Sequence, residues 1–296
     1  MQYLHLLGAL NSAVAKQADA GTRSCTGSPS LFWEKHWRLH LFEIRHMTIK
    51  NLYESLVIAF STYSSIPMPK VDWNDENMKY TICFFPLIGA VIGGISWLFA
   101  ALAASLRIGV ILRSAVLVLI PLAVTGGIHL DGLLDAADAL SSWKPRQERL
   151  AIMKDSHCGA FAVIWCCAYF LASFGVFSEM KTSSPSCMAQ LLLTYMTARA
   201  YSGLALLTFP KAKHTGLLRT FSDKAMNDRG ARILTGMLAV LTALMILTAP
   251  VRGVICSLAG AAGFWLYRRL SERHLAGSPA TWRAVSSAWR SCVWRL

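Results

Sequence analysis

A series of long apolar runs, separated by short polar links, constrains this chain more than any other feature. The runs are Tyr80–Leu106, Ile108–Val124, Phe161–Phe177, Met188–Phe209, Ile233–Pro250 and Gly253–Leu266. A helix of about 17–25 apolar residues can cross a bilayer with its backbone hydrogen bonds satisfied internally. We therefore predict an all-α fold, a polytopic membrane helical bundle with six transmembrane helices, or seven if a shorter segment at Leu52–Tyr63 also crosses.

Composition agrees with a membrane protein and argues against other classes. Hydrophobic residues make up 54% of the 296 residues, and the mean hydropathy is +0.43, too apolar for an ordinary soluble domain. The net charge of +13 comes from Lys and Arg at the edges of apolar runs rather than from a basic stripe interleaved with aromatics, so we expect no nucleic-acid partner. The eight cysteines form no CxxC pair, which argues against a zinc site.

The distribution of positive charge also predicts how the protein is oriented in the membrane. The loops Trp143–His157 and Lys211–Arg232 are both basic and are separated by two predicted crossings, so they lie on one side of the membrane. By the positive-inside rule that side is cytoplasmic.

The N-terminal residues differ from the rest. Residues 1–46 are polar and without sustained periodicity, and Met47 is followed at once by an apolar segment, so we interpret residues 1–46 as a non-homologous extension or an over-extended start. Leu52–Tyr63 has one apolar helical face and is stopped by Ile66-Pro67-Met68-Pro69. It predicts a short membrane-associated or re-entrant helix.

A cluster of carboxylates follows the second apolar run directly, in the string Gly126–Asp138. At 100° per residue, Asp135 lies about 40° from Asp131 and Asp138 about 20° on its other side, so the three acids share one helical face. Mutual repulsion near a membrane means that either the acids take up protons or a divalent cation lies between them. For such a cation, oxygen ligands favour Mg²⁺ or Mn²⁺ over zinc. The alternative is that Asp131 caps the helix and the other acids meet its positive end.

A second polar group precedes the third apolar run. Lys154, Asp155, Ser156 and Gly159 supply a cation, an acid, a hydroxyl and backbone N–H groups, a set suited to binding a phosphate. Asp155 is a further candidate for metal ligation or for orienting the substrate.

Two more polar residues are candidates with open alternatives. Arg199 lies in the middle of an apolar run, where it either neutralises a bound anion or pairs with a carboxylate to hold helices together. His129 is a ligand, a base or only a polar residue at a helix start. Gly126 and Gly127 are candidates for the substrate-binding turn.

Carboxylates beside anion-binding residues at the cytoplasmic face indicate a phosphoryl or nucleotidyl transferase with a lipophilic or bulky substrate. The rival class is an ion-coupled transporter that uses its intramembrane carboxylates to coordinate a driving ion. The string at Asp131 begins like the core of CDP-alcohol phosphotransferases and then departs, because Asp135 stands where that motif requires Ala.

Three stretches together resemble one family closely: Phe85–Gly89, Gly126–Asp138 and Ile152–Gly159 are similar to the signature of the cobalamin synthase family of adenosylcobinamide-GDP ribazoletransferases. The similarity runs from about Met47 to Arg273, which we interpret as a membrane transferase domain of residues 47–273.

The resemblance implies a multi-pass enzyme of the bacterial inner membrane in late cobalamin biosynthesis. It would join adenosylcobinamide-GDP to α-ribazole or its 5′-phosphate, release GMP and require Mg²⁺. Asp131, Asp135 and Asp138 would hold the cation, Lys154 and Arg199 would neutralise the leaving GMP, and Asp155 or His129 would accept the hydroxyl proton. Its partners would be the two substrates and membrane lipid, with other cobalamin-assembly enzymes or a second copy of the chain left open.

The sequence departs from the family pattern at three places. Ser65 stands where the family usually has Arg, and Ala139 where Gly is common. The family's Gly-Gly-x-Thr-Gly-Asp segment is replaced by Ala276–Trp282 and an Arg- and Trp-rich tail. A shifted reading frame of the same bases permits Gly-Gly-Val-Thr-Gly-Asp-Val, so we hypothesise that residues 274–296 follow a frameshift.

Overall fold

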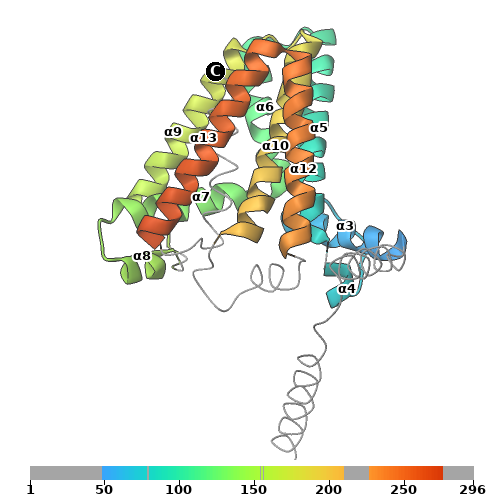
Figure 1. The fold of residues 1–296 in the computed structure, drawn as a ribbon. Helices are drawn as coiled ribbons and strands as arrows, with labels where there is room; N and C mark the ends of the chain where they lie inside the picture. Colours follow the sequence, from blue (N-terminus) through green and yellow to red (C-terminus); the bar gives the residue numbers. More distant parts are fainter. Residues whose placement is uncertain (1–48, 79, 154, 156, 210–226, 276–296) are drawn as a thin grey trace, which may run out of the picture. The chain divides into compact units, whose positions relative to one another are not determined.

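The computed structural model describes residues 49–78, 80–153, 155, 157–209 and 227–275 (Figure 1). These residues form helices joined by short links and contain no strand. The chain divides after Ile49, and the arrangement described below concerns the unit that begins at Lys50. The predictions for residues 1–46, for most of the loop Lys211–Arg232 and for most of the tail 274–296 lie outside the described residues.

Helix α10 (Pro185–Thr208) packs mainly against α5 (Phe85–Ser105), which follows the short 3₁₀ helix η1 (Thr81–Phe84), and against α12 (Asn227–Thr248). Its contact with α5 depends on glycines four residues apart. A Cβ atom on Gly93 would lie 2.6 Å from the Cα of Leu192, and one on Gly89 would collide with the backbone oxygen of Tyr195. Small residues at this spacing allow two helix backbones to approach closely in lipid.

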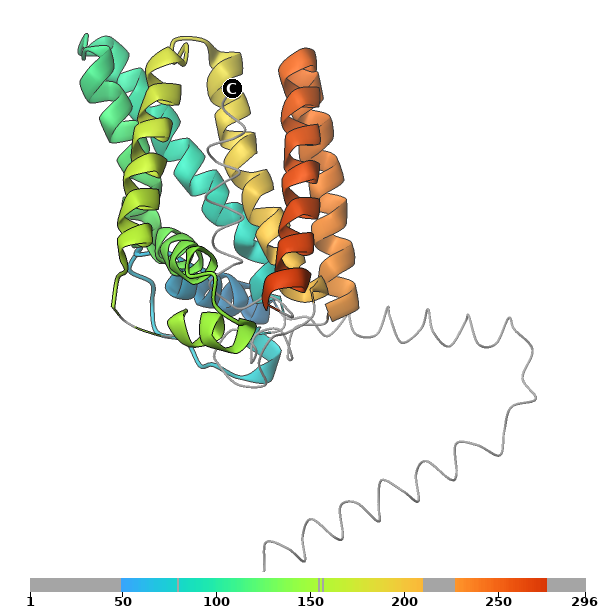
Figure 2. The same cartoon turned by 90° about the vertical axis from the view of Figure 1, so that its left-hand side faces the viewer.

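The remaining helices surround this centre. α6 (Val110–Thr125) packs against α5 and α9 (Ala160–Glu179), and α13 (Pro250–Leu275) packs mainly against α12. Between α6 and α9 the chain forms α7 (Ile128–Ser141) and the short α8 (Arg146–Ile152). Figure 2 shows α7 beside the lower end of α9.

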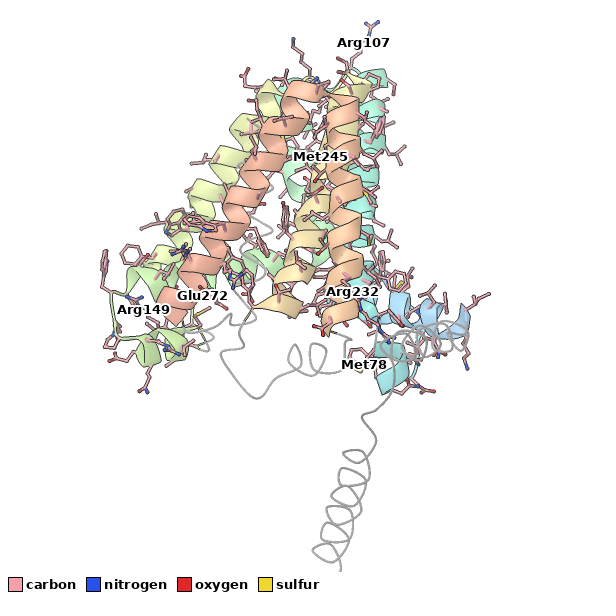
Figure 3. All side chains as sticks on the ribbon, viewed as in Figure 1. Met78, Arg107, Arg149, Arg232, Met245 and Glu272 are labelled. Carbon is pink, nitrogen blue, oxygen red and sulfur yellow. The ribbon has the colours of Figure 1, made fainter. Side chains whose placement is uncertain are left out.

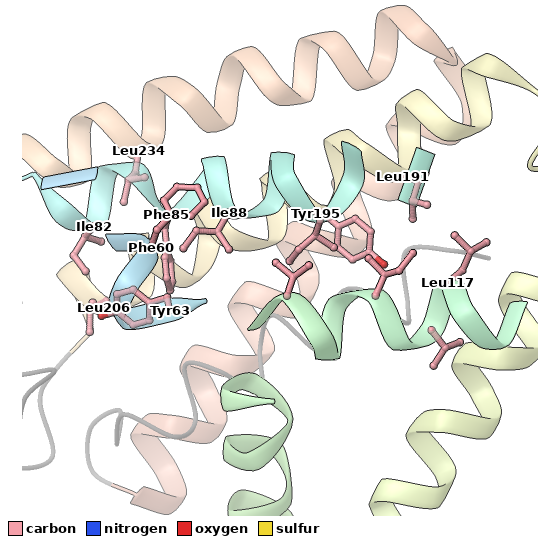
Figure 4. Packing of buried hydrophobic residues seen from close by; sticks show 14 of the residues in the cluster. Phe60, Tyr63, Ile82, Phe85, Ile88, Leu117, Leu191, Tyr195, Leu206 and Leu234 are labelled. Atoms are coloured by element: carbon pink, nitrogen blue, oxygen red, sulfur yellow. The ribbon is translucent and has the colours of Figure 1, made fainter. Parts of the chain in front are cut away.

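The main apolar cluster joins α3 (Ile49–Tyr63), η1, α5, α6, α10 and α12 (Figure 4). The rings of Tyr63 and Phe85 meet edge to face with centroids 4.4 Å apart. Buried side chains around them include Phe60, Ile82, Ile88, Leu206 and Leu234. The predicted short helix before Ile66 is thus a docked part of the core, and α4 (Asp75–Met78) lies in the link that follows it.

Each predicted apolar run is helical over most of its length, so the all-helical membrane class is confirmed. The number of crossings is not. Within the described part of the chain, three helical stretches are long and apolar enough to span: Thr81–Ser105, Ala160–Glu179 and Asp228–Thr248. A fourth is possible if the bent pair α6 and α7 counts as one span.

Helix α10 does not meet that criterion because polar residues interrupt its apolar sequence. Gln190, Thr194 and Arg199 are buried among the neighbouring helices. Since protein rather than lipid surrounds α10, its polar side chains can be satisfied inside the bundle. Mean hydropathy therefore understates how completely the other helices enclose α10.

Charged residues mark the two ends of the long helices (Figure 3). Arg149 on α8, Arg232 near the start of α12 and Glu272 near the end of α13 lie toward one end, and Arg107 after α5 lies at the other. The carboxylate-bearing helix α7 is at the first of these ends.

Candidate functional site

Two consecutive glycines turn the chain from α6 into α7. Gly126 and Gly127 both have positive φ, 60° and 78°, a conformation that costs side-chain-bearing residues free energy. The Gly127 carbonyl accepts hydrogen bonds from the N–H groups of Leu130 and Asp131, at 2.8 and 2.9 Å. The axes of α6 and α7 consequently differ by 95°, which sets α7 across the end of the long helices. Both glycines, predicted to bind substrate, build this turn.

Ser65 holds the preceding segment to the same corner. Its N–H donates to the carbonyl of Val124 at 2.9 Å, and its hydroxyl donates to the carbonyl of Ala123. These carbonyls belong to the last turn of α6, where no further helical N–H is available to them. Ser65, at the position that departs from the family pattern, therefore ties the end of α3 to the α6–α7 turn.

Helix α7 has one buried face and one acidic face. His129, Leu133 and Ala136 are buried, whereas Asp131 is exposed and Asp135 is half-buried. His129 lies about 160° around the helix from Asp131, on the opposite side. The structure thus brings the carboxylates together and separates His129 from them.

Asp138, the third acid, contacts the beginning of α9. Its Oδ2 accepts a 2.7 Å hydrogen bond from the N–H of Gly159, and its Oδ1 accepts one of 2.9 Å from the N–H of Ala162. Gly159 is the N-cap residue of α9 and has no side chain that could accept the N–H of Ala162. Asp138 therefore caps α9 from another helix.

The carboxylates fit a cation held by two protein ligands better than one held by three. No group of three or more His, Cys, Asp or Glu side chains in the described residues is arranged to hold a metal ion. Asp131 and Asp138 lie near enough for their charges to repel a charge on Asp135, but both oxygens of Asp138 face the backbone of α9. Mg²⁺ commonly uses one or two carboxylates together with substrate phosphates, which Asp131 and Asp135 could provide.

The segment between α8 and α9 contains a carboxylate–imidazole pair. Oδ1 of Asp155 lies 2.6 Å from Nδ1 of His157 and accepts a 3.0 Å hydrogen bond from the His157 N–H. The side-chain hydrogen bond lowers the pKa of Asp155 and raises the pKa of His157. Lys154 and Ser156 lie outside the described residues, so their predicted phosphate contacts remain predictions.

His157 is a polar residue of this segment that the sequence reasoning did not select. The signal was present, because an Asp two residues before a His can accept that residue's backbone N–H in a local turn. Gly159, predicted to bind substrate through its N–H, instead donates that N–H to Asp138.

His129 and Arg199 are both inside the bundle, with exposed fractions of 6% and 5%. Arg199 lies near Tyr169 and Tyr195, and it is close enough to His129 for an electrostatic interaction. The His129 ring lies 6.1 Å from the Phe85 ring, and its Nδ1 has no hydrogen-bond partner within the described structure. This burial favours a structural role for Arg199, the alternative stated from the sequence, over direct contact with a bulky substrate.

Comparison with known proteins finds relatives over most of the chain. A family model described as cobalamin-5-phosphate synthase matches residues 55–278. A protein of Lachnoclostridium phytofermentans named adenosylcobinamide-GDP ribazoletransferase is 41% identical over 225 residues, which cover 76% of this chain and 85% of the relative. A protein of the same name from Desulfitobacterium hafniense is 29% identical over 224 residues, covering 75% and 87%. No solved structure is similar to the chain.

Proposed function

Because the chain belongs to the cobalamin-5-phosphate synthase family, we propose that it is a transferase that joins adenosylcobinamide-GDP to α-ribazole or α-ribazole 5′-phosphate. The observation that carries this function is the 41% identity to a ribazoletransferase over 85% of that relative's length. Nothing found in the fold or among the relatives favours the ion-coupled transporter.

The reaction forms one P–O bond and breaks another. A ribose hydroxyl oxygen that is free in both α-ribazole and α-ribazole 5′-phosphate attacks the phosphorus on the cobinamide side of the diphosphate. The bond between that phosphorus and the bridging oxygen breaks, and GMP departs with the electron pair. The hydroxyl proton passes to a base, and charge builds up on the phosphate oxygens during the exchange.

We place the diphosphate of the substrate beside the acidic face of α7. Asp131 and Asp135 form no hydrogen bond or ion pair with other described residues, so their oxygens remain available for a cation. A Mg²⁺ ion held there would neutralise charge on the diphosphate and orient it. The two carboxylates hold that position because α7 begins directly after the Gly126-Gly127 turn and is packed on its opposite face by Leu133 and Ala136.

Asp155 is the better-supported proton acceptor of the two residues considered. It is exposed, so a substrate hydroxyl can reach its carboxylate. His129 is buried on the face of α7 away from the carboxylates. Lys154, next to Asp155 in sequence, would neutralise the leaving phosphate as a point charge.

The enzyme would work as a multi-pass protein of the bacterial inner membrane with this face toward the cytoplasm. Exposed apolar side chains along α9, among them Val163, Ile164 and Leu171, suit contact with lipid. The charged ends of α8 and α12 lie on the same side as α7, as the positive-inside rule requires of a cytoplasmic site.

The direct test incubates membranes containing the chain with adenosylcobinamide-GDP, α-ribazole and Mg²⁺. We expect GMP and a cobamide to appear in equal amounts, and membranes carrying Asp135→Asn at the same protein level to produce neither. Uptake of corrinoid into sealed vesicles without release of GMP would instead indicate a transporter.

A further inference from the structure

The beginning of α9 depends on a side chain from a different helix. The N–H of Ala162, the third helical residue, is one that an N-cap Ser, Thr, Asp or Asn would ordinarily satisfy, and the N–H of the N-cap Gly159 is one that a Glu or Gln in place of Ala162 would satisfy. Asp138, 21 residues before Gly159, satisfies both with its two oxygens. A carboxylate at this place also meets the positive end of the helix dipole.

The fit between Asp138 and Gly159 leaves no room for a larger residue. A Cβ atom on Gly159 would lie 2.6 Å from Oδ1 and 2.7 Å from Oδ2 of Asp138. The φ angle of Gly159 is −84°, which any residue can adopt, so the need for glycine here comes from contact with the carboxylate and not from backbone conformation.

A second contact holds the other end of the same segment. Met153, which ends α8, is buried in an apolar cluster with Leu133 and Ala136 of α7. The chain between Met153 and Gly159 therefore leaves α7 at one anchored point and returns to it at another. That stretch carries the hydrogen-bonded pair of Asp155 and His157.

We propose that Asp138 is a positioning residue: its carboxylate fastens the Met153–Gly159 segment and the start of α9 to α7, and the cation is left to Asp131 and Asp135. The proposal deepens the transferase function proposed above and rests on it for the substrate. The three acids are equivalent by sequence, but in this proposal Asp131 and Asp135 face the substrate, whereas Asp138 fixes the start of α9 against α7.

Three variants distinguish a positioning role of Asp138 from a role in binding the cation. Asp138→Ala removes both hydrogen-bond acceptors, and Gly159→Ala keeps the carboxylate but inserts a methyl group into its position. Asp131→Asn is the matched control on the same face of α7. Each is purified in detergent, and two properties are followed: hydrogen exchange of peptides covering 157–163 without substrate, and turnover as a function of Mg²⁺ and of adenosylcobinamide-GDP.

A positioning role predicts that Asp138→Ala and Gly159→Ala behave alike. We expect amide exchange at 157–163 to accelerate about tenfold or more, because charge-assisted hydrogen bonds protect these groups. The KM for adenosylcobinamide-GDP should rise several-fold, and the Mg²⁺ concentration for half-maximal rate should stay within about twofold. Asp131→Asn should instead raise the Mg²⁺ requirement about tenfold or more and leave the exchange unchanged.

Either of two results would overturn the proposal. One is that Asp138→Ala raises the Mg²⁺ requirement as much as Asp131→Asn does while exchange at 157–163 stays slow. The other is that the Asp138 and Gly159 variants lower only the maximal rate while exchange at 157–163 stays slow, as a smaller active fraction would. The exchange measurement uses no substrate, so it remains decisive about the contact even if the wild-type protein forms no cobamide.

Discussion

Oδ1 of Asp155 and Nδ1 of His157 lie 2.6 Å apart, and both side chains face solvent between α8 and α9. The pair is local, since the same carboxylate oxygen also accepts the His157 backbone N–H. Its consequence is electrostatic, because each group stabilises the charged form of the other.

The pair predicts a specific pH dependence. Asp155 raises the pKa of His157 above its ordinary 6.5. The stability that the charged imidazole adds to the folded state is therefore fully present below pH 6.5 and is lost as pH rises through the higher pKa of the folded protein. The pKa of Asp155 is lowered, so its contribution is present above 3.8 and is lost as pH falls through the lower folded value. We expect NMR titration of His157 to give a midpoint above 6.5 that falls toward 6.5 in Asp155→Asn. An unchanged midpoint in that variant would refute the pairing.

Asp135 is expected to be indispensable for turnover. Asp135→Asn keeps the size of the side chain and its half-buried position on α7, but removes the charge that would bind Mg²⁺. We predict a loss of activity of about a hundredfold or more with normal membrane insertion, measured as GMP release per milligram of enzyme. Glu148→Gln on α8, an exposed acid paired with Lys144, is the control and should retain activity. Near-normal turnover by Asp135→Asn would remove the metal role.

The turn between α6 and α7 should not tolerate a side chain at Gly127. Its φ of 78° would cost an alanine about 1–2 kcal/mol although no atom blocks the methyl group closer than 3.4 Å. We expect Gly127→Ala to lower the midpoint of thermal unfolding in detergent. Gly109→Ala is the comparison, since Gly109 has a φ of −61° and open space around it. Equal midpoints for the two variants would show that the turn is not strained by a side chain.

The close contact of α5 with α10 predicts different responses at adjacent glycines. A methyl group at Gly93 would lie 2.6 Å from the backbone of Leu192, whereas one at Gly94 meets nothing within 4 Å. We expect Gly93→Ala to destabilise the folded protein by about 1–3 kcal/mol, as overpacking does, and Gly94→Ala to have little effect. Unfolding of both variants by a denaturant in mixed micelles tests this, and equal stabilities would contradict the packing of these two helices.

Local sequence determined much of the fold. Each apolar run is helical over most of its length, because a chain in lipid must satisfy its backbone hydrogen bonds within the segment. The spacing of Asp131, Asp135 and Asp138 placed the acids on one side of α7, since the period of the helix fixes their angles about its axis. The motif around them was specific enough to indicate the family to which the chain belongs.

What each residue faces was decided by the tertiary structure. His129 is two residues from Asp131 but buried on the far side of α7, and Arg199 is enclosed within the bundle. Asp138 contacts Gly159 and Ala162 across 21 and 24 residues of sequence. Helical periodicity sets the direction of a side chain from its own axis, but the partner that it meets depends on how separate helices pack. The sequence by itself therefore determined the helices and the shared face of the three acids, and only their packing separated Asp138 from the other two.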